Sequence, residues 1–211
     1  MSAAPGPAQS PEPSPWNLPN ALTVLRIILV PVYGWLLLTH GGEDATLRWW
    51  AFVVFVVAMA TDKIDGDLAR SRGLVTNFGK IADPIADKAL TGMGFIGLSI
   101  IGDIPWVLTI IVLVREWGIT ALRFVVIRHG VMPAGRGGKL KTVLQAVSLT
   151  LFTMPLWTLP LSGVWVAIAW IVLIAAVLVT VVTGVDYVIK ARQLVAGSAR
   201  TAERRASRGG S

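Results

Sequence analysis

The sequence predicts an all-α integral membrane protein with six transmembrane helices. Of its 211 residues, 54% are hydrophobic and only 15% are charged, whereas a soluble domain carries about a quarter charged residues. The apolar residues form six stretches, most of them near the roughly 20 residues that a helix needs to cross a bilayer. Because stretches of this length satisfy their own backbone hydrogen bonds as helices, a barrel of short alternating strands is excluded.

Short segments rich in glycine and proline, which are typical turn signals, separate the six stretches. In order, the stretches cover residues 21–38, 47–61, 83–101, 105–127, 139–159 and 163–189. The second stretch is short, and we expect its helix to continue through residues 62–70, where the charged side chains emerge into water. The chain contains no cysteine, which excludes disulfide bonds and thiolate metal centres.

The chain is expected to have three parts. Residues 1–15 hold five prolines and one charged residue, so they are expected to form a disordered tail. They lack the pattern of a secretory signal, so the first span is expected to stay in the protein. Residues 16–190 form the six-helix domain, and residues 191–211 form a basic cytoplasmic tail that acts as a topology signal and contacts the lipid surface.

The basic residues predict the orientation of the helices. When alternate loops are assigned to alternate sides, 18 of the 19 Lys and Arg fall on one side, and only Arg48 falls on the other. The positive-inside rule therefore places both termini in the cytoplasm. The formal net charge of +7 is explained by anionic lipid and anionic substrates at that face, so no nucleic-acid partner is expected.

Four carboxylates in the segment 61–90 have a spacing that suggests a metal site. Asp62 and Asp65 are three residues apart, and Asp83 and Asp87 are four apart, so each pair lies on one face of its helix. Two such helices meeting at the cytoplasmic side would gather four carboxylates, which would repel one another unless cations were bound. Hard oxygen ligands of this kind suit Mg²⁺ or Mn²⁺. Each residue taken alone can also be an ordinary solvated residue at a membrane rim.

The same segment carries a family pattern. Its fixed positions, spaced D-x2-D-G-x2-A-R-x8-G-x3-D-x3-D, are Asp62, Asp65, Gly66, Ala69, Arg70, Gly79, Asp83 and Asp87. This pattern resembles the signature of the CDP-alcohol phosphatidyltransferase family, and the resemblance covers about residues 17–190. Segments 17–26, 83–88, 115–123 and 137–142 are similar to the branch of that family that forms phosphatidylglycerophosphate in bacteria.

The resemblance implies a membrane-bound, metal-dependent transferase. It implies transfer of the phosphatidyl group from CDP-diacylglycerol to sn-glycerol 3-phosphate, with release of CMP, by a multi-pass homodimer in the bacterial plasma membrane. Two divalent ions, Mg²⁺ or Mn²⁺, would be held by Asp62, Asp65, Asp83 and Asp87, and Asp87 would also be the catalytic base. Two metals suit this chemistry because charge develops on the attacking, leaving and equatorial oxygens.

The resemblance also assigns the CDP-diacylglycerol contacts. They are Asn20, Thr23, Gly66, Ala69, Arg70, Thr76 and Gly79. Arg70 offers a fork for phosphate oxygens, although it can also be an arginine that only reaches for the interface. Asn20 can instead be a helix N-cap after Pro19, and Gly79 can be only a helix breaker.

The acceptor is a dianion, so its site needs fixed positive charge. The candidates are Arg115, Arg123, Lys139 and Lys141. Arg115 and Arg123 are eight residues apart and lie nearly on one face of a helix. A buried arginine in a membrane needs a partner, and Glu116 or Asp186 can supply one for Arg115.

Two other classes of function remain as alternatives. Related transferases use inositol phosphate, phosphatidylglycerol or serine as acceptors, and the basic residues favour a phosphorylated alcohol among these. A small cation transporter is the more distant alternative, but it predicts acidic residues near the membrane centre on discontinuous helices. The glycine-rich segment 135–142 lacks the residues of a Walker loop, which excludes nucleotide hydrolysis.

Overall fold

The computed structural model describes residues 17–71, 74, 76–126 and 136–209, without the side chains of residues 63, 65, 67, 69, 70, 136 and 198–209. These residues form six α-helices and two short 3-10 helices, and there is no strand among them. The helices are α1 (Leu18–Leu38), η1 (Thr39–Gly42), α2 (Ala45–Ser71), α3 (Asn77–Ile100), α4 (Trp106–Val126), α5 (Arg136–Thr153), η2 (Leu156–Thr158) and α6 (Ser162–Gly209). The all-helical prediction is therefore confirmed.

Three segments of the described chain are long and apolar enough to cross a membrane. They are Leu18–Gly42, Ala45–Asp62 and Ser162–Gly197. The helices α3, α4 and α5 are more polar than these three segments, because every stretch of 18 residues within them contains at least three charged residues. Most of these charged residues are the ones that the sequence assigns to a site.

The helix boundaries confirm one expectation and correct two others. As expected, α2 continues through the charged residues 62–70 and ends at Ser71. The fifth helix was expected to reach residue 159, but α5 ends at Thr153, because Pro155 lacks a backbone N–H and disfavours helix just before it. The sixth was expected to end at residue 189, but α6 runs for 48 residues to Gly209.

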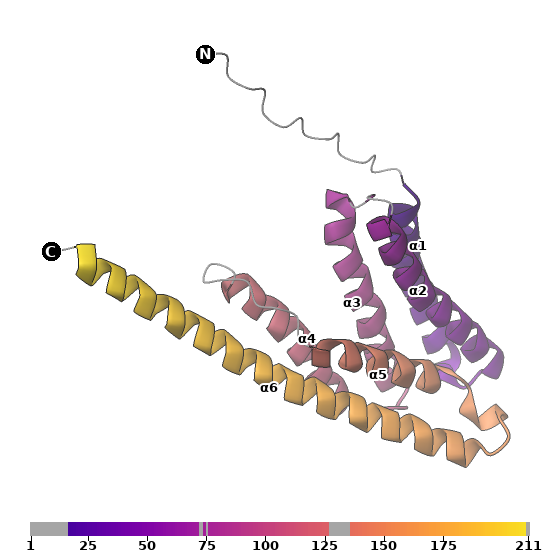
Figure 1. Ribbon diagram of the computed structural model, residues 1–211. Coiled ribbons are helices and arrows are strands. Elements are labelled where there is room, and N and C mark those ends of the chain that lie inside the picture. The colour runs from indigo at the N-terminus through magenta and orange to yellow at the C-terminus, as the bar shows by residue number, and fades with distance from the viewer. Residues whose placement is uncertain (1–16, 72–73, 75, 127–135, 210–211) are drawn as a thin grey trace, which may run out of the picture.

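The six helices form two groups (Figure 1). The first three, α1, α2 and α3, pack against one another, while α4 and α5 both pack along α6. Contacts of α3 with α4 and α5, and of α2 with α5, join the two groups. Figure 1 also shows that α6 is the longest helix and extends well beyond the others toward the C-terminus. The third helix therefore lies where the two groups meet.

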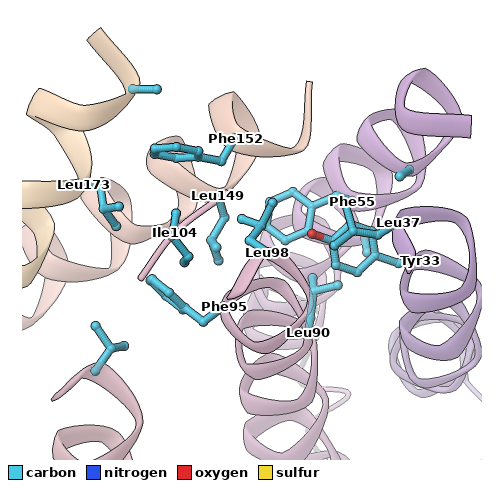
Figure 2. Close-up of a cluster of buried hydrophobic side chains, with 14 of the residues drawn as sticks. Tyr33, Leu37, Phe55, Leu90, Phe95, Leu98, Ile104, Leu149, Phe152 and Leu173 are labelled. Atoms are coloured by element: carbon cyan, nitrogen blue, oxygen red, sulfur yellow. The ribbon is translucent and has the colours of Figure 1, made fainter. Parts of the chain in front are cut away.

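A cluster of buried apolar side chains holds the groups together, as Figure 2 shows. The rings of Tyr33 on α1 and Phe55 on α2 lie 5.2 Å apart between their centroids. Glycines on α3 allow its backbone to approach its neighbours. A Cβ atom on Gly97 would lie 2.7 Å from Leu37 of α1, and one on Gly94 would lie 3.1 Å from Leu149 of α5. Small residues of this kind permit close helix packing in membranes.

A buried ion pair ties several elements together at the end of the bundle opposite the carboxylates. Arg48 in α2 is only 2% exposed, and its Nη2 atom lies 2.7 Å from Asp103 Oδ2 in the connection between α3 and α4. The guanidinium also donates to the carbonyl oxygens of Phe152 and Thr153 at the end of α5. The ring of Trp157 lies 5.2 Å from it. One cation therefore joins α2, the α3–α4 connection and the end of α5.

The substitution Arg48→Ala is expected to destabilise the fold strongly. It leaves the Asp103 carboxylate and the two α5 carbonyls without their donor. Breaking a fully buried ion pair costs about 3–5 kcal/mol, and the loss here should lie toward the lower end because the Asp103 side chain is 31% exposed. The apparent unfolding temperature of the purified protein in detergent should therefore fall clearly. Lys190→Ala is a matched control, because the Lys190–Asp186 pair has the same 2.7 Å distance but is exposed, and exposed pairs contribute about 0–1 kcal/mol. Equal losses in the two variants would contradict this role of Arg48.

Candidate active site

The beginning of α1 is fixed against the beginning of α3. Asn17 is the N-cap of α1, where its side chain accepts a hydrogen bond from Asn20 N at 2.9 Å. The interpretation of Asn20 as the N-cap is therefore wrong. Asn20 is buried, and its Oδ1 accepts a hydrogen bond from the Thr76 hydroxyl at 3.0 Å. Thr76 is the N-cap of α3 and accepts from Gly79 N. Three predicted CDP-diacylglycerol contacts, Asn20, Thr76 and Gly79, thus lie together.

Gly79 makes this approach possible. It lies in the first turn of α3, so it does not break the helix as the alternative interpretation held. A Cβ atom there would lie 3.0 Å from Asn20 Oδ1 and 3.7 Å from Asp83 Oδ2. The absent side chain leaves room for Asn20 beside the carboxylate of Asp83.

The first helix also orients two of the predicted metal ligands. The hydroxyl of Thr23, which is buried, donates to Asp83 Oδ1 at 2.6 Å. Arg26 lies one turn further along α1 and is fully buried, and its Nη1 lies 2.6 Å from Asp62 Oδ1 on α2. The Asp62 side chain keeps 43% of its surface exposed. In each of these two carboxylates, a side chain of α1 thus holds one oxygen.

Asp87 lies one turn after Asp83 on α3 and is partly buried. It lies within electrostatic range of Asp62 on α2 and of Lys141 on α5. The fold therefore brings three of the four predicted carboxylates into one region. Asp65 and the predicted CDP contacts Ala69 and Arg70 belong to α2, but their side chains lie outside the described residues, and Gly66 is partly exposed in that helix.

The chemistry of this region suits a divalent cation. Carboxylate oxygens are the hard ligands that Mg²⁺ and Mn²⁺ prefer, and side chains of α1 hold one oxygen each of Asp62 and Asp83. Within the described part of the chain, no group of three or more acidic or histidine residues is close enough to hold a metal. The predicted set includes Asp65, whose side chain is not part of that description.

A cavity of about 1010 Å³ lies among α3, α4, α5 and α6. All four residues predicted to bind the acceptor phosphate line it: Arg115, Arg123, Lys139 and Lys141. Lys88, which directly follows Asp87 on α3, lines it as well. Because Pro84 and Lys88 of α3 both line the cavity and flank Asp87 in the chain, the basic cavity and the carboxylates are neighbours.

Side chains of α4 and α6 hold the arginines of this cavity. The two Nη atoms of Arg115 reach Glu116 Oε1 at 3.1 Å and the Thr183 hydroxyl at 2.9 Å. Arg123 donates to the Tyr187 hydroxyl, and its Cζ atom lies 4.9 Å from the centre of that ring.

The two suggested partners of Arg115 have different outcomes. Glu116 is confirmed as a partner of Arg115. Asp186 lies 2.7 Å from Lys190 on the surface of α6, so the alternative partnership of Asp186 with Arg115 is wrong.

The sequence prediction missed several residues of these two regions. Arg26 had one usable signal, because it is the sole charged residue of α1, and a lone charge in a membrane helix needs a partner. Lys88 donates to the Thr120 hydroxyl and lies 5.1 Å from the centre of the Trp117 ring. Thr183 and Tyr187 lie one turn apart on α6, but nothing in an apolar helix marks them as supports for arginines on another helix.

The arrangement places a cluster of acidic residues beside a basic cavity. The first can hold cations and the second can hold a small anion, so the pair suits a reaction between two phosphate-bearing molecules. Both α2 and α3 are continuous through their carboxylates, which disfavours the transporter alternative, since that requires discontinuous helices.

Comparisons with known proteins agree with this chemistry. The family model for CDP-alcohol phosphatidyltransferase matches residues 16–191. The chain is 50% identical over 186 residues to the probable phosphatidylglycerophosphate synthase of Mycobacterium tuberculosis (strain ATCC 25618 / H37Rv), a match that covers 88% of this chain and 87% of the relative.

Two further relatives are named CDP-diacylglycerol--glycerol-3-phosphate 3-phosphatidyltransferase. That of Bacillus subtilis (strain 168) is 37% identical over 145 residues, which cover 64% of this chain and 75% of the relative. That of Rickettsia typhi (strain ATCC VR-144 / Wilmington) is 37% identical over 139 residues, which cover 65% of this chain and 76% of the relative. With the family model matched over residues 16–191, the chain belongs to the CDP-alcohol phosphatidyltransferase family.

Proposed function

We propose that the protein transfers the phosphatidyl group from CDP-diacylglycerol to sn-glycerol 3-phosphate, giving phosphatidylglycerophosphate and CMP. The observation that carries this proposal is the basic cavity lined by Arg115, Arg123, Lys139 and Lys141, which is also lined by Lys88, the residue that follows Asp87 on α3. A dianionic acceptor suits such a cavity. The printed names of the relatives, which include glycerol 3-phosphate, support the same acceptor.

The carboxylates would hold two divalent ions, Mg²⁺ or Mn²⁺, through Asp62, Asp65, Asp83 and Asp87. Bound there, the ions would supply positive charge to the attacking and leaving oxygens of the phosphoryl transfer. Thr23 and Arg26 orient Asp83 and Asp62 from α1.

Asp87 accepts the proton of the acceptor hydroxyl in this proposal. Its position supports the role, because it is within electrostatic range of both Asp62 and Lys141 and directly precedes Lys88 of the cavity lining. A general base must lie within hydrogen-bond reach of the proton that it takes. An acceptor whose phosphate lies in the basic cavity would have its hydroxyl toward α3.

The donor would lie along the beginnings of α1 and α3. Asn20, Thr23, Thr76 and Gly79 are the predicted contacts that the structure gathers there, and Gly66, Ala69 and Arg70 of α2 complete the proposed set. Gly79 contributes indirectly, since the space beside it is filled by Asn20.

The orientation and assembly belong to the same proposal. Six membrane spans with both termini in the cytoplasm would place the carboxylates and the basic cavity at the cytoplasmic side of the bacterial plasma membrane. The one-sided distribution of basic residues supports this orientation. A homodimer follows from the resemblance to the family.

The acceptor and the metal requirement can be tested together. The purified protein should release CMP from CDP-diacylglycerol with glycerol 3-phosphate, but not with inositol phosphate, serine or phosphatidylglycerol, and only when Mg²⁺ or Mn²⁺ is present. CMP release is the readout. Full activity in excess chelator would rule out the metal sites, and a preference for another acceptor would overturn the proposed reaction.

The substitution Asp87→Asn is expected to lower kcat by about 100-fold or more, because it removes a proton acceptor and a metal ligand at once. Steady-state rates of CMP release measure this. Asp186→Asn is the matched control, since Asp186 is an exposed carboxylate that pairs with Lys190 away from the cavity lining, and it should stay near the wild-type rate. A near-normal rate for Asp87→Asn would move the base to another residue.

The substitution Lys139→Ala should raise KM for glycerol 3-phosphate about tenfold, which corresponds to about 1.4 kcal/mol of binding free energy. Lys139 lines the basic cavity, so the variant would no longer offer an ammonium to the phosphate of the acceptor. KM for CDP-diacylglycerol should stay nearly unchanged. If the variant weakened the donor and left the acceptor unaffected, the division between the two subsites would be wrong.

A further inference from the structure

A single carboxylate lies among the cations of the basic cavity. Of the described residues that line it, five are Lys or Arg, and Glu116 alone is acidic. A cavity for an anionic acceptor gains nothing from a negative charge unless that charge has another use. The contacts of Glu116 show what that use is.

One oxygen of Glu116 holds two of the cations. Its Oε1 lies 2.5 Å from Lys141 Nζ and 3.1 Å from Arg115 Nη1. The Lys141 side chain is only 9% exposed, and that of Arg115 is 12% exposed. An ammonium so far from water is costly without a nearby anion. Glu116 therefore allows Lys141 to be both buried and charged.

The Glu116–Lys141 pair also joins two helices across the cavity. Glu116 belongs to α4 and Lys141 to α5, and both helices pack mainly along α6. The other arm of Arg115 donates to Thr183 of α6 at 2.9 Å. The guanidinium of Arg115 and the ammonium of Lys141 are thus fixed relative to one another, and the point that fixes both is Glu116 Oε1.

The cavity remains strongly basic despite this carboxylate. Arg123 is held by Tyr187, a neutral side chain, and Lys139 is exposed at the cavity with no ion pair among the described contacts. Glu116 offsets only one of five positive charges. The net positive charge of the cavity still exceeds the two negative charges of a phosphate group. Glu116 therefore weakens the attraction of the acceptor only a little, while it fixes the positions of Lys141 and Arg115.

We propose that Glu116 is a positioning residue for the acceptor, which holds Lys141 and Arg115 in the arrangement that binds the phosphate group of a small phosphorylated alcohol. This inference rests on the proposed function. It assigns Glu116 no contact with the substrate, since its action passes through the two cations. Preorganised donors of this kind avoid the cost of ordering flexible side chains during binding.

Kinetics of Glu116→Gln, Glu116→Asp, Lys141→Ala and the double variant Glu116→Gln/Lys141→Ala test this proposal. Glu116→Gln should raise KM for glycerol 3-phosphate about tenfold, with KM for CDP-diacylglycerol changed less than about twofold. Glu116→Asp keeps the charge but shortens the side chain, so its KM should be intermediate. The double variant should raise KM by less than the product of the two single effects, because part of the action of Glu116 passes through Lys141 and the rest through Arg115.

Thr180→Val provides a structural control on α6, the helix along which α4 and α5 pack. It removes the hydrogen bond of 3.0 Å between Gln145 of α5 and Thr180 of α6, outside the basic cavity lining. It should lower the apparent unfolding temperature without changing KM. If Glu116→Gln behaves in the same way, its role is only structural and the proposal is overturned.

Other outcomes are equally decisive. A lower KM for glycerol 3-phosphate in Glu116→Gln would show that the carboxylate competes with the acceptor, and additive effects in the double variant would show that it does not act through Lys141. If Glu116→Gln does not fold, a wild-type KM in Glu116→Asp overturns the proposal. A wild-type protein that does not use glycerol 3-phosphate at all would contradict the proposed function instead.

Discussion

Charge inside a membrane protein must find a partner within the protein, because lipid supplies none, and this constraint organises the whole structure. Arg48 is neutralised by Asp103 at one end of the bundle. At the other end, Arg26 is paired with Asp62, and Glu116 serves both Arg115 and Lys141. Each of these pairs joins separate elements or serves a second cation, so the contacts that neutralise the buried charges also fix the bundle.

The pairing also separates two kinds of chemistry between the two groups of helices. The carboxylates belong to α2 and α3, and α1 orients two of them. Most of the cations of the cavity belong to α4 and α5, and α6 supports its two arginines. The third helix takes part in both, since Asp87 and Lys88 are adjacent in it. The reacting groups would meet where the two groups of helices meet.

The sequence predicted the elements well because long apolar stretches leave a chain few choices in a bilayer. It also predicted four of the five cations that line the cavity, since charged residues in such stretches are conspicuous. It did not predict the residues that support the arginines. Thr183 and Tyr187 look like ordinary residues of an apolar helix, and their role depends on α4 packing beside α6. It also did not predict that Asn17 caps α1, while Asn20 accepts a hydrogen bond from Thr76, 56 residues away in the chain.

The Arg48–Asp103 pair has an electrical consequence for the whole molecule. Arg48 is the one exception to the one-sided distribution of basic residues, and its charge is cancelled by Asp103 at 2.7 Å. The neighbouring exposed residues Glu43 and Asp44 are acidic, so this end carries no net positive charge. Among the described residues, charge is therefore uneven along the bundle: the end at Arg48 is neutral to negative, whereas five cations and one carboxylate line the basic cavity.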